Sequence, residues 1–268
     1  MSPRRRLLVA ALVVLLFAGA GIVGARLLRT AAPAVDPVAR PAQDRPGPVL
    51  LVPGYGGSRT GLLQLADRIE ATGRSATVLT LVGDGTGDLS AQVAVLDTAV
   101  DAVLAAGAPS VDVVGYSAGG VVAGLWVARD DGAVKARRIV TLGAPLAGTS
   151  LAATATVVAP DACPAACCQL APGSAEITEL TRARVGEALP WLSVWTADDE
   201  TVTPPATASQ LAGTVQLQVQ TVCAGARVTH SALPTDPAVT GVVLRALAPE
   251  PLAAAVSGAD CAELRAAG

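Results

Sequence analysis

From Val49 onward, short apolar runs with β propensity alternate with longer segments that carry apolar residues at helical spacing. Two of the helix-like segments end at Gly73 and Gly107, as helices commonly do. Strands that alternate with helices form βαβ units, in which helices cover both faces of a mostly parallel sheet. We therefore predict one α/β domain over residues 49–268. The expected strands lie in 49–52, 75–81, 111–117, 136–145, 189–205 and 213–220, and the expected helices in 60–72, 90–106, 118–130 and 237–248.

The N-terminus has the features of an export segment. Three arginines at positions 4–6 precede an uncharged apolar run from Leu7 to Ala25. A basic start, an apolar middle and small residues at a cleavage site are typical of a secretory signal, but the run is also long enough to span a bilayer. Residues 1–25 are therefore predicted to be a signal peptide or a membrane anchor, and both remain open. Residues 26–48, rich in Ala, Pro and Arg, are predicted to be a flexible linker.

The charge and the cysteine content limit the cellular locations and binding partners that can be expected for this protein. The net charge is −3 and no basic block follows the first residues, so a nucleic-acid partner is not expected. The five cysteines agree with export, because thiols outside the cytoplasm tend to pair. Their odd number leaves at least one without a partner in the chain. We predict an exported monomer whose membrane contact, if any, is made through its N-terminal segment.

Ser117 is the candidate nucleophile. It stands in Gly-Tyr-Ser-Ala-Gly, where the expected strand 111–117 gives way to the expected helix 118–130. A serine on such a sharp turn is strained, and small residues two positions away on either side relieve the crowding. The turn raises the hydroxyl above the sheet, and the N-terminus of the following helix favours negative charge there.

A serine nucleophile needs a base and an acid that follow it in the chain. His230 is the only histidine, and it lies between the last expected strand and the last expected helix. An imidazole is suited to taking the serine proton near neutral pH. The acid should come between the serine and the histidine, where Asp198, Asp199 and Glu200 directly follow a strand.

At this point the sequence resembles the secreted microbial lipases and esterases, of actinobacterial type, in the α/β-hydrolase superfamily. Their acid loop often reads D-x-x-V-x-P, and this spacing selects Asp199, with Asp198 as the alternative. The segment VTLGAPLAGT at 140–149 resembles the strand and turn that follow the nucleophile helix in these enzymes. The resemblance implies an α/β-hydrolase fold with a small cap or lid, expected here at residues 146–185.

The segment VLLVPGYGGS at 49–58 resembles the oxyanion loop of the same lipases. By this resemblance, the backbone N–H groups of Tyr55 and Ala118 would hold the oxyanion of the tetrahedral intermediate. The sequence departs from the family at Pro53, where many relatives have a histidine.

The resemblance also implies a disulfide between Cys223 and Cys261, which would join the segment before the histidine to the C-terminal tail. Cys163 could pair with Cys167 or Cys168 in the expected cap. A zinc site at these three cysteines lacks a suitable fourth ligand nearby.

The segment GDGTGDL at 83–89 is expected to be a turn that leads into a helix capped by Asp88 or Ser90. It has too few oxygen ligands for an EF-hand and lacks the Gly-Lys of a P-loop. It should lie at the carboxyl edge of the sheet, within reach of a substrate.

Together these features predict an exported serine hydrolase that cleaves carboxylic esters, lipids or acylglycerols among them, through an acyl-enzyme on Ser117. No metal or organic cofactor is expected. An acyltransferase or thioesterase with the same triad, and an inactive tethered binding protein on the same scaffold, are the alternatives.

Overall fold

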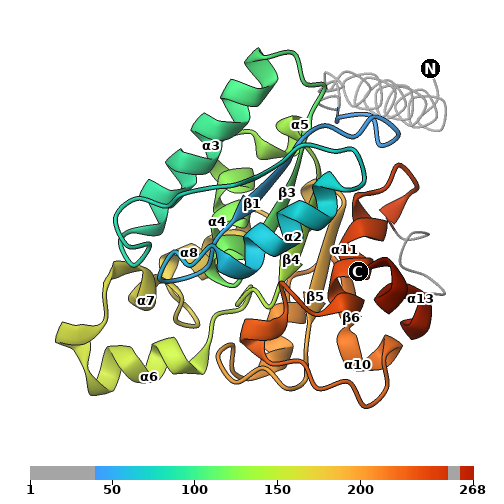
Figure 1. Cartoon of the computed structure of the whole chain (residues 1–268). Coiled ribbons are helices and arrows are strands. Elements are labelled where there is room, and N and C mark those ends of the chain that lie inside the picture. The colour runs from blue at the N-terminus through green and yellow to red at the C-terminus, as the bar shows by residue number, and fades with distance from the viewer. Residues whose placement is uncertain (1–39, 253–259) are drawn as a thin grey trace, which may run out of the picture. The chain divides into compact units, whose positions relative to one another are not determined.

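The structure is a computed structural model, and it describes residues 40–252 and 260–268. Its centre is a sheet of six strands in the order β2-β1-β3-β4-β5-β6, and every neighbouring pair is parallel (Figure 1). The prediction of a mostly parallel sheet is therefore confirmed. The strands are β1 (Val49–Val52), β2 (Ala76–Val78), β3 (Val111–Tyr116), β4 (Ala136–Leu142), β5 (Trp191–Trp195) and β6 (Val215–Gln218).

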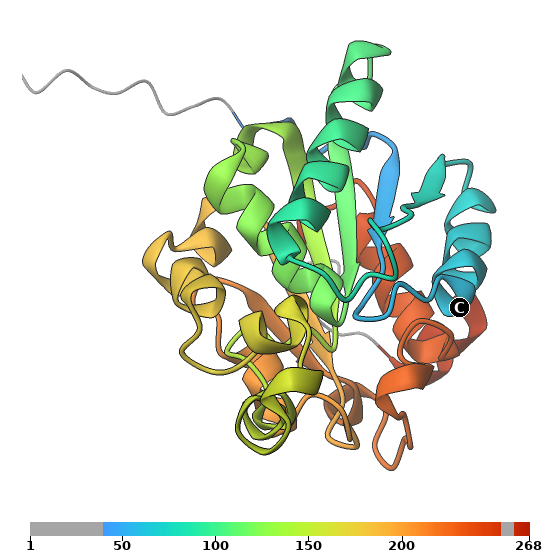
Figure 2. The same ribbon diagram turned by 90° about the vertical axis from the view of Figure 1, so that its left-hand side faces the viewer.

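Helices cover both faces of the sheet, and each face has its own apolar core (Figure 2). The alternation along β1 shows the division: Leu50 and Val52 pack into one core, while Val49 and Leu51 pack into the other. Helices α3 (Leu89–Ala105) and α4 (Ala118–Arg129) belong to the first core, and α2 (Thr60–Glu70) and α11 (Pro237–Leu247) to the second.

The cap region, residues 146–185, is more regular than the sequence suggests. Instead of irregular chain it consists largely of short helices, and its part from residue 150 to residue 169 projects at the lower left of Figure 1. None of them is long enough to show a clear apolar period over several turns, so the pattern of the sequence could not reveal them. They are α6 (Ser150–Val158), the 3₁₀ turn η1 (Pro160–Ala162), α7 (Ala165–Gln169) and α8 (Ala175–Arg182), and α9 (Val185–Ala188) follows.

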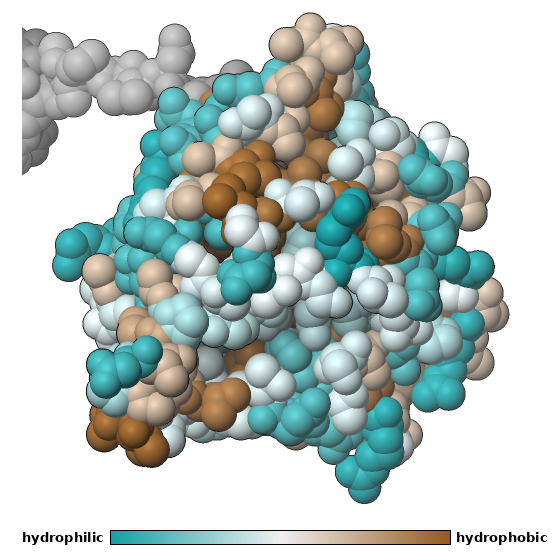
Figure 3. Space-filling view, turned by 60° about the vertical axis from the view of Figure 1, so that its left-hand side comes forward, coloured by the Kyte–Doolittle hydropathy of each residue, from teal (hydrophilic) through white to brown (hydrophobic). Residues whose placement is uncertain are grey.

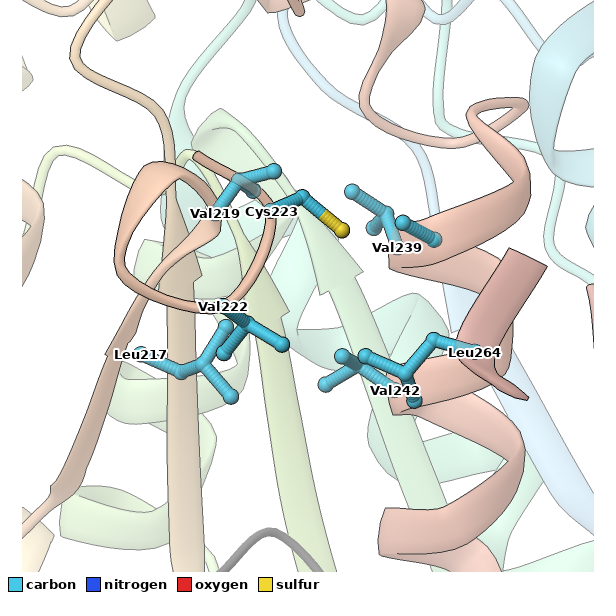
Figure 4. Close-up of a pocket in the computed structure, with 8 residues that line it drawn as sticks. Leu217, Val219, Val222, Cys223, Val239, Val242 and Leu264 are labelled. Atoms are coloured by element: carbon cyan, nitrogen blue, oxygen red, sulfur yellow. The ribbon is translucent and has the colours of Figure 1, made fainter. Parts of the chain in front are cut away.

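The C-terminal tail forms a further helix that the sequence analysis did not anticipate, α13 (Cys261–Ala267). It packs closely on α11. The two helices approach each other so tightly at Gly241 that a Cβ atom there would lie 2.2 Å from the Leu264 carbonyl oxygen, so only glycine fits. The predicted Cys223–Cys261 disulfide is present and ties this helix to the segment after β6. Apolar side chains between these segments enclose a small cavity, to which Cys223 and Leu264 contribute (Figure 4).

Four further short helical segments were not predicted from the sequence. They are α5 (Gly132–Lys135), η2 (Pro205–Ser209), α10 (Val219–Val222) and η3 (His230–Ala232).

The described part of the expected linker, residues 40–48, lies against the domain. The Gln43 side chain donates to the Arg137 carbonyl at 3.0 Å, and the Asp112 amide donates to the Pro48 carbonyl at 2.9 Å. One compact unit begins at Arg40, and these contacts lie within it. The predicted signal peptide or anchor at 1–25 lies outside the described residues. None of the described helices has the length and apolar character needed to cross a membrane.

Buried charges gather at the amino end of the sheet. Asp112 and Arg137 have no exposed surface and are joined by two hydrogen bonds, of 2.5 and 3.0 Å. Arg74 contacts the same carboxylate at 2.7 Å. Carbonyls at the carboxyl end of α11 complete the cluster: Leu247 accepts from Arg137 at 2.6 Å, and Ala246 accepts from Arg138 at 2.6 Å.

Candidate active site

Ser117 lies on the turn between β3 and α4 with φ 52° and ψ −125°, a backbone conformation that L-residues rarely adopt. The glycines of the motif permit this turn. A side chain on Gly115 would come within 2.6 Å of Gly120 Cα, and one on Gly119 within 2.2 Å of the Val52 carbonyl oxygen. The spacing Gly-x-Ser-x-Gly is therefore a packing requirement of the turn.

The structure brings Ser117, His230 and Asp199 together. Ser117 Oγ lies 3.0 Å from His230 Nε2, and Asp199 Oδ2 lies 2.8 Å from His230 Nδ1. All three residues are largely buried, with exposed fractions of 8%, 5% and 6%. A carboxylate on Nδ1 leaves the lone pair of the neutral ring at Nε2, facing the serine hydroxyl.

Asp199, and not Asp198, is the carboxylate that reaches the histidine. The second oxygen of Asp199 accepts the amides of Val202 at 2.7 Å and Thr201 at 3.0 Å, which fixes the direction of the side chain. Asp198 instead contacts Arg227 at 3.1 Å and Gln220 at 3.3 Å.

Thr149 holds the acid loop in place. Its hydroxyl donates to the Thr201 carbonyl at 3.0 Å and accepts the Thr203 amide at 3.0 Å. This threonine ends the segment VTLGAPLAGT at 140–149, whose sequence alone indicates no role for it. Its position directly before α6 joins the cap region to the loop that carries Asp199.

Two residues that the sequence analysis did not assign hold the peptide of His230 from both sides. The Tyr116 hydroxyl donates to the His230 carbonyl at 3.2 Å, and the Glu200 carboxylate accepts the His230 amide at 3.0 Å. Burial, with the nearby Asp199 and Glu200 charges, raises the pKa of Tyr116 to about 12. Its hydroxyl therefore stays protonated and remains a donor at neutral pH.

The two predicted oxyanion donors flank the serine. Ala118 is the first residue of α4, so its amide has no acceptor within the helix. Tyr55 lies in a turn closed by the Gly57 amide and the Gly54 carbonyl at 3.0 Å. A side chain on Gly54 would come within 2.9 Å of Ser117 Cβ, which places this turn directly beside the serine.

Pro53 occupies the position where the resemblance leads one to expect histidine. Its carbonyl lies against the start of α4, 2.6 Å from where a Gly119 Cβ would be. The loop is thus packed against the turn of Ser117 without that histidine.

No protein-family model and no curated protein matches the sequence. Solved structures do match the fold. Lipase B of Aspergillus fumigatus superposes with a TM-score of 0.61 at 17% identity, over 82% of this chain and 60% of that one. The mature form of the Bacillus licheniformis lipase BlEst2 superposes with a TM-score of 0.50 at 20% identity, over 61% of this chain and 70% of that one. The chain has the α/β-hydrolase fold. It spans about 60% of the length of the Aspergillus lipase.

In this α/β-hydrolase fold, the loop at 83–89 lies beside the turn that carries Tyr55. A side chain on Gly85 would come within 2.7 Å of the Gly57 amide nitrogen. Asp88 caps α3 by accepting the Ser90 amide at 2.7 Å, which decides between the two expected caps. Within residues 40–252 and 260–268, no group of three or more His, Cys, Asp or Glu side chains is arranged to hold a metal ion.

Proposed function

We propose that this chain is a serine hydrolase that cleaves carboxylic esters through an acyl-enzyme on Ser117. One observation carries the proposal: the continuous contact from Asp199 to His230 to Ser117, at 2.8 and 3.0 Å. The backbone strain at Ser117 supports it, because strained residues are retained where a function requires the geometry. The two similar structures described above are both lipases, which agrees with an ester substrate.

The geometry leads to a two-step mechanism. Ser117 Oγ attacks the ester carbonyl carbon while His230 Nε2 takes the hydroxyl proton, and the amides of Tyr55 and Ala118 hold the oxyanion. His230 then gives the proton to the leaving alcohol, and an acyl-serine remains. Water, deprotonated by the same Nε2, releases the acid and restores the serine. Asp199 orients the imidazole and stabilises the imidazolium.

The proposal is tested by incubating the folded, oxidised protein with p-nitrophenyl esters of short and long acyl chains. A fluorophosphonate should in parallel label the peptide that contains Ser117, because this reagent reacts with activated serines. Absence of both hydrolysis and labelling would reject the proposed function. Labelling without hydrolysis would favour transfer of the acyl group to an acceptor other than water.

Asp199 should matter far more than its neighbour Asp198. We expect Asp199→Asn to lower kcat by about 10⁴-fold, because an amide at that position favours the wrong histidine tautomer. Asp198→Asn is the matched control and should retain kcat, since the Asp198 side chain bonds to Arg227 and Gln220 rather than to His230. Initial rates with p-nitrophenyl butyrate measure both. Equal losses in the two variants would contradict the assignment of Asp199.

We further propose that the natural esters are poorly soluble in water, as lipids are. The outer end of α6 supports this, because Val157 and Val158 are 80% and 76% exposed. Figure 3 shows apolar surface at the lower left, where this end of α6 lies. Large aliphatic side chains in such exposure favour contact with an apolar surface.

Replacing both valines by serine tests the role of this surface. The double variant Val157→Ser/Val158→Ser should lose several-fold activity on an emulsified long-chain ester, because it has less apolar area to bury at the droplet. Hydrolysis of dissolved p-nitrophenyl acetate should be unchanged, since both side chains are largely exposed whereas Ser117, His230 and Asp199 are buried. An unchanged rate on the emulsion would contradict the proposal.

Export also belongs to the proposal. The basic and apolar N-terminal segment and the two disulfides both favour a location outside the cytoplasm.

A further inference from the structure

Three cysteines meet in the cap region, outside the proposed site. Cys163 and Cys167 form a disulfide, and the Cys168 thiol is free and exposed. The Cys168 sulfur lies 3.3 Å from the Cys163 sulfur and 3.5 Å from the Cys163 carbonyl oxygen. A free thiol is therefore in contact with one sulfur of a disulfide, and these two groups are the reactants of thiol–disulfide exchange.

We propose that Cys163, Cys167 and Cys168 form an internal thiol–disulfide exchange site. The Cys168 thiolate attacks Cys163 Sγ, a Cys163–Cys168 bond forms and the Cys163–Cys167 bond breaks. Cys167 leaves as a thiolate and takes up a proton, which balances the proton that Cys168 lost to solvent. One disulfide and one thiol stand on each side of the reaction, so neither an oxidant nor a reductant is needed.

The position of the sulfurs selects Cys163 as the shared partner. Cys167 and Cys168 are consecutive on α7, and the sulfurs of both lie beside that of Cys163. The two alternative rings differ in length by one residue, so their closure entropies are nearly equal. Cys163 is 9% exposed whereas Cys168 is exposed, so solvent reaches the attacking thiol more easily than the attacked sulfur.

The contacts of α7 indicate which segment moves. The Ala166 amide donates to the Thr86 carbonyl at 3.1 Å, and Gln169 Oε1 accepts the Leu89 amide at 2.8 Å. These contacts hold α7 against the loop at 83–89 and the start of α3. Exchange should therefore displace Cys163 and the adjacent η1 rather than α7. Because η1 follows the outer end of α6, the two disulfide forms would hold that end differently.

Trapping of free thiols in the wild-type protein tests the exchange. Oxidised protein is kept at pH 8 without added thiol and then alkylated with N-ethylmaleimide. After the disulfides are reduced and capped with iodoacetamide, tandem mass spectrometry of the digest locates the N-ethylmaleimide label, because fragmentation between the adjacent Cys167 and Cys168 distinguishes them. We expect one label per chain, divided between Cys167 and Cys168. Label on Cys168 alone would overturn the proposal.

Two variants make the result specific. Cys168→Ser removes the attacking thiol, so no label should appear at Cys167 and thiol titration should find no free thiol. Cys167→Ser should oxidise to a Cys163–Cys168 disulfide and also titrate with no free thiol. Two free thiols per chain in oxidised Cys167→Ser would show that the second bond does not form, and would overturn the proposal. Neither readout depends on the hydrolase function.

Discussion

Ser117→Ala should lower kcat for p-nitrophenyl ester hydrolysis by about 10⁵-fold or more, because the acyl-enzyme can no longer form. The residual rate would come from oxyanion binding by the amides of Tyr55 and Ala118, which the substitution leaves in place. Initial rates under identical conditions measure the change. Ser209→Ala is the matched control, because that hydroxyl donates to the Ala206 carbonyl of its own turn, at 2.8 Å.

The stability of the same position provides an independent check. Alanine keeps the Cβ atom that is strained at φ 52°, so Ser117→Ala should unfold at nearly the wild-type temperature. Ser117→Gly removes that Cβ and should be more stable by about 1 kcal/mol. An alanine variant that is folded and still hydrolyses esters at the wild-type rate would contradict the assignment of the nucleophile.

The second large effect is expected far from the proposed site, at Asp112. Asp112→Ala should lower the free energy of unfolding by about 3–5 kcal/mol, because it leaves the buried Arg137 without its counter-charge. The cluster already has more positive than negative charge. Burial, together with the neighbouring Arg137 charge, lowers the pKa of Arg138 to about 10. Urea unfolding followed by tryptophan fluorescence measures the loss.

An exposed ion pair supplies the control for Asp112. Arg227 is 88% exposed in its contact with Asp198, so Arg227→Ala should leave the free energy of unfolding nearly unchanged. A loss below about 1 kcal/mol in Asp112→Ala would mean that water reaches Arg137 readily in the folded protein.

Much of the fold could be predicted because its signals are local. Alternating apolar residues mark a strand and helical spacing marks a helix, so β1, α2 and α3 begin within a residue or two of their expected limits. The order of the strands in the sheet, in contrast, cannot be predicted from local signals. The sequence shows six strands in succession, but the position of β1 between β2 and β3 depends on how the helices pack.

The proposed site likewise contains one residue that the local sequence predicts and another that only the packed structure selects. The strained turn at Ser117, our proposed nucleophile, could be predicted from five consecutive residues, because that turn also requires the neighbouring glycines. Asp198 and Asp199 are adjacent and chemically alike, so only the direction of each side chain separates them. The Val202 amide and the Thr149 hydroxyl decide that direction by fixing the acid loop.

The sequence by itself determined the alternation of strands and helices, and it supplied the serine that we propose as nucleophile and the one histidine that could serve it. Each of these is encoded over a few neighbouring residues or by residue type alone. The tertiary structure decided the strand order, the choice of Asp199, the hold of Tyr116 and Glu200 on His230, and the meeting of three cysteine sulfurs. These depend on contacts and side-chain directions that local periodicity does not encode, since they arise only when the segments pack together.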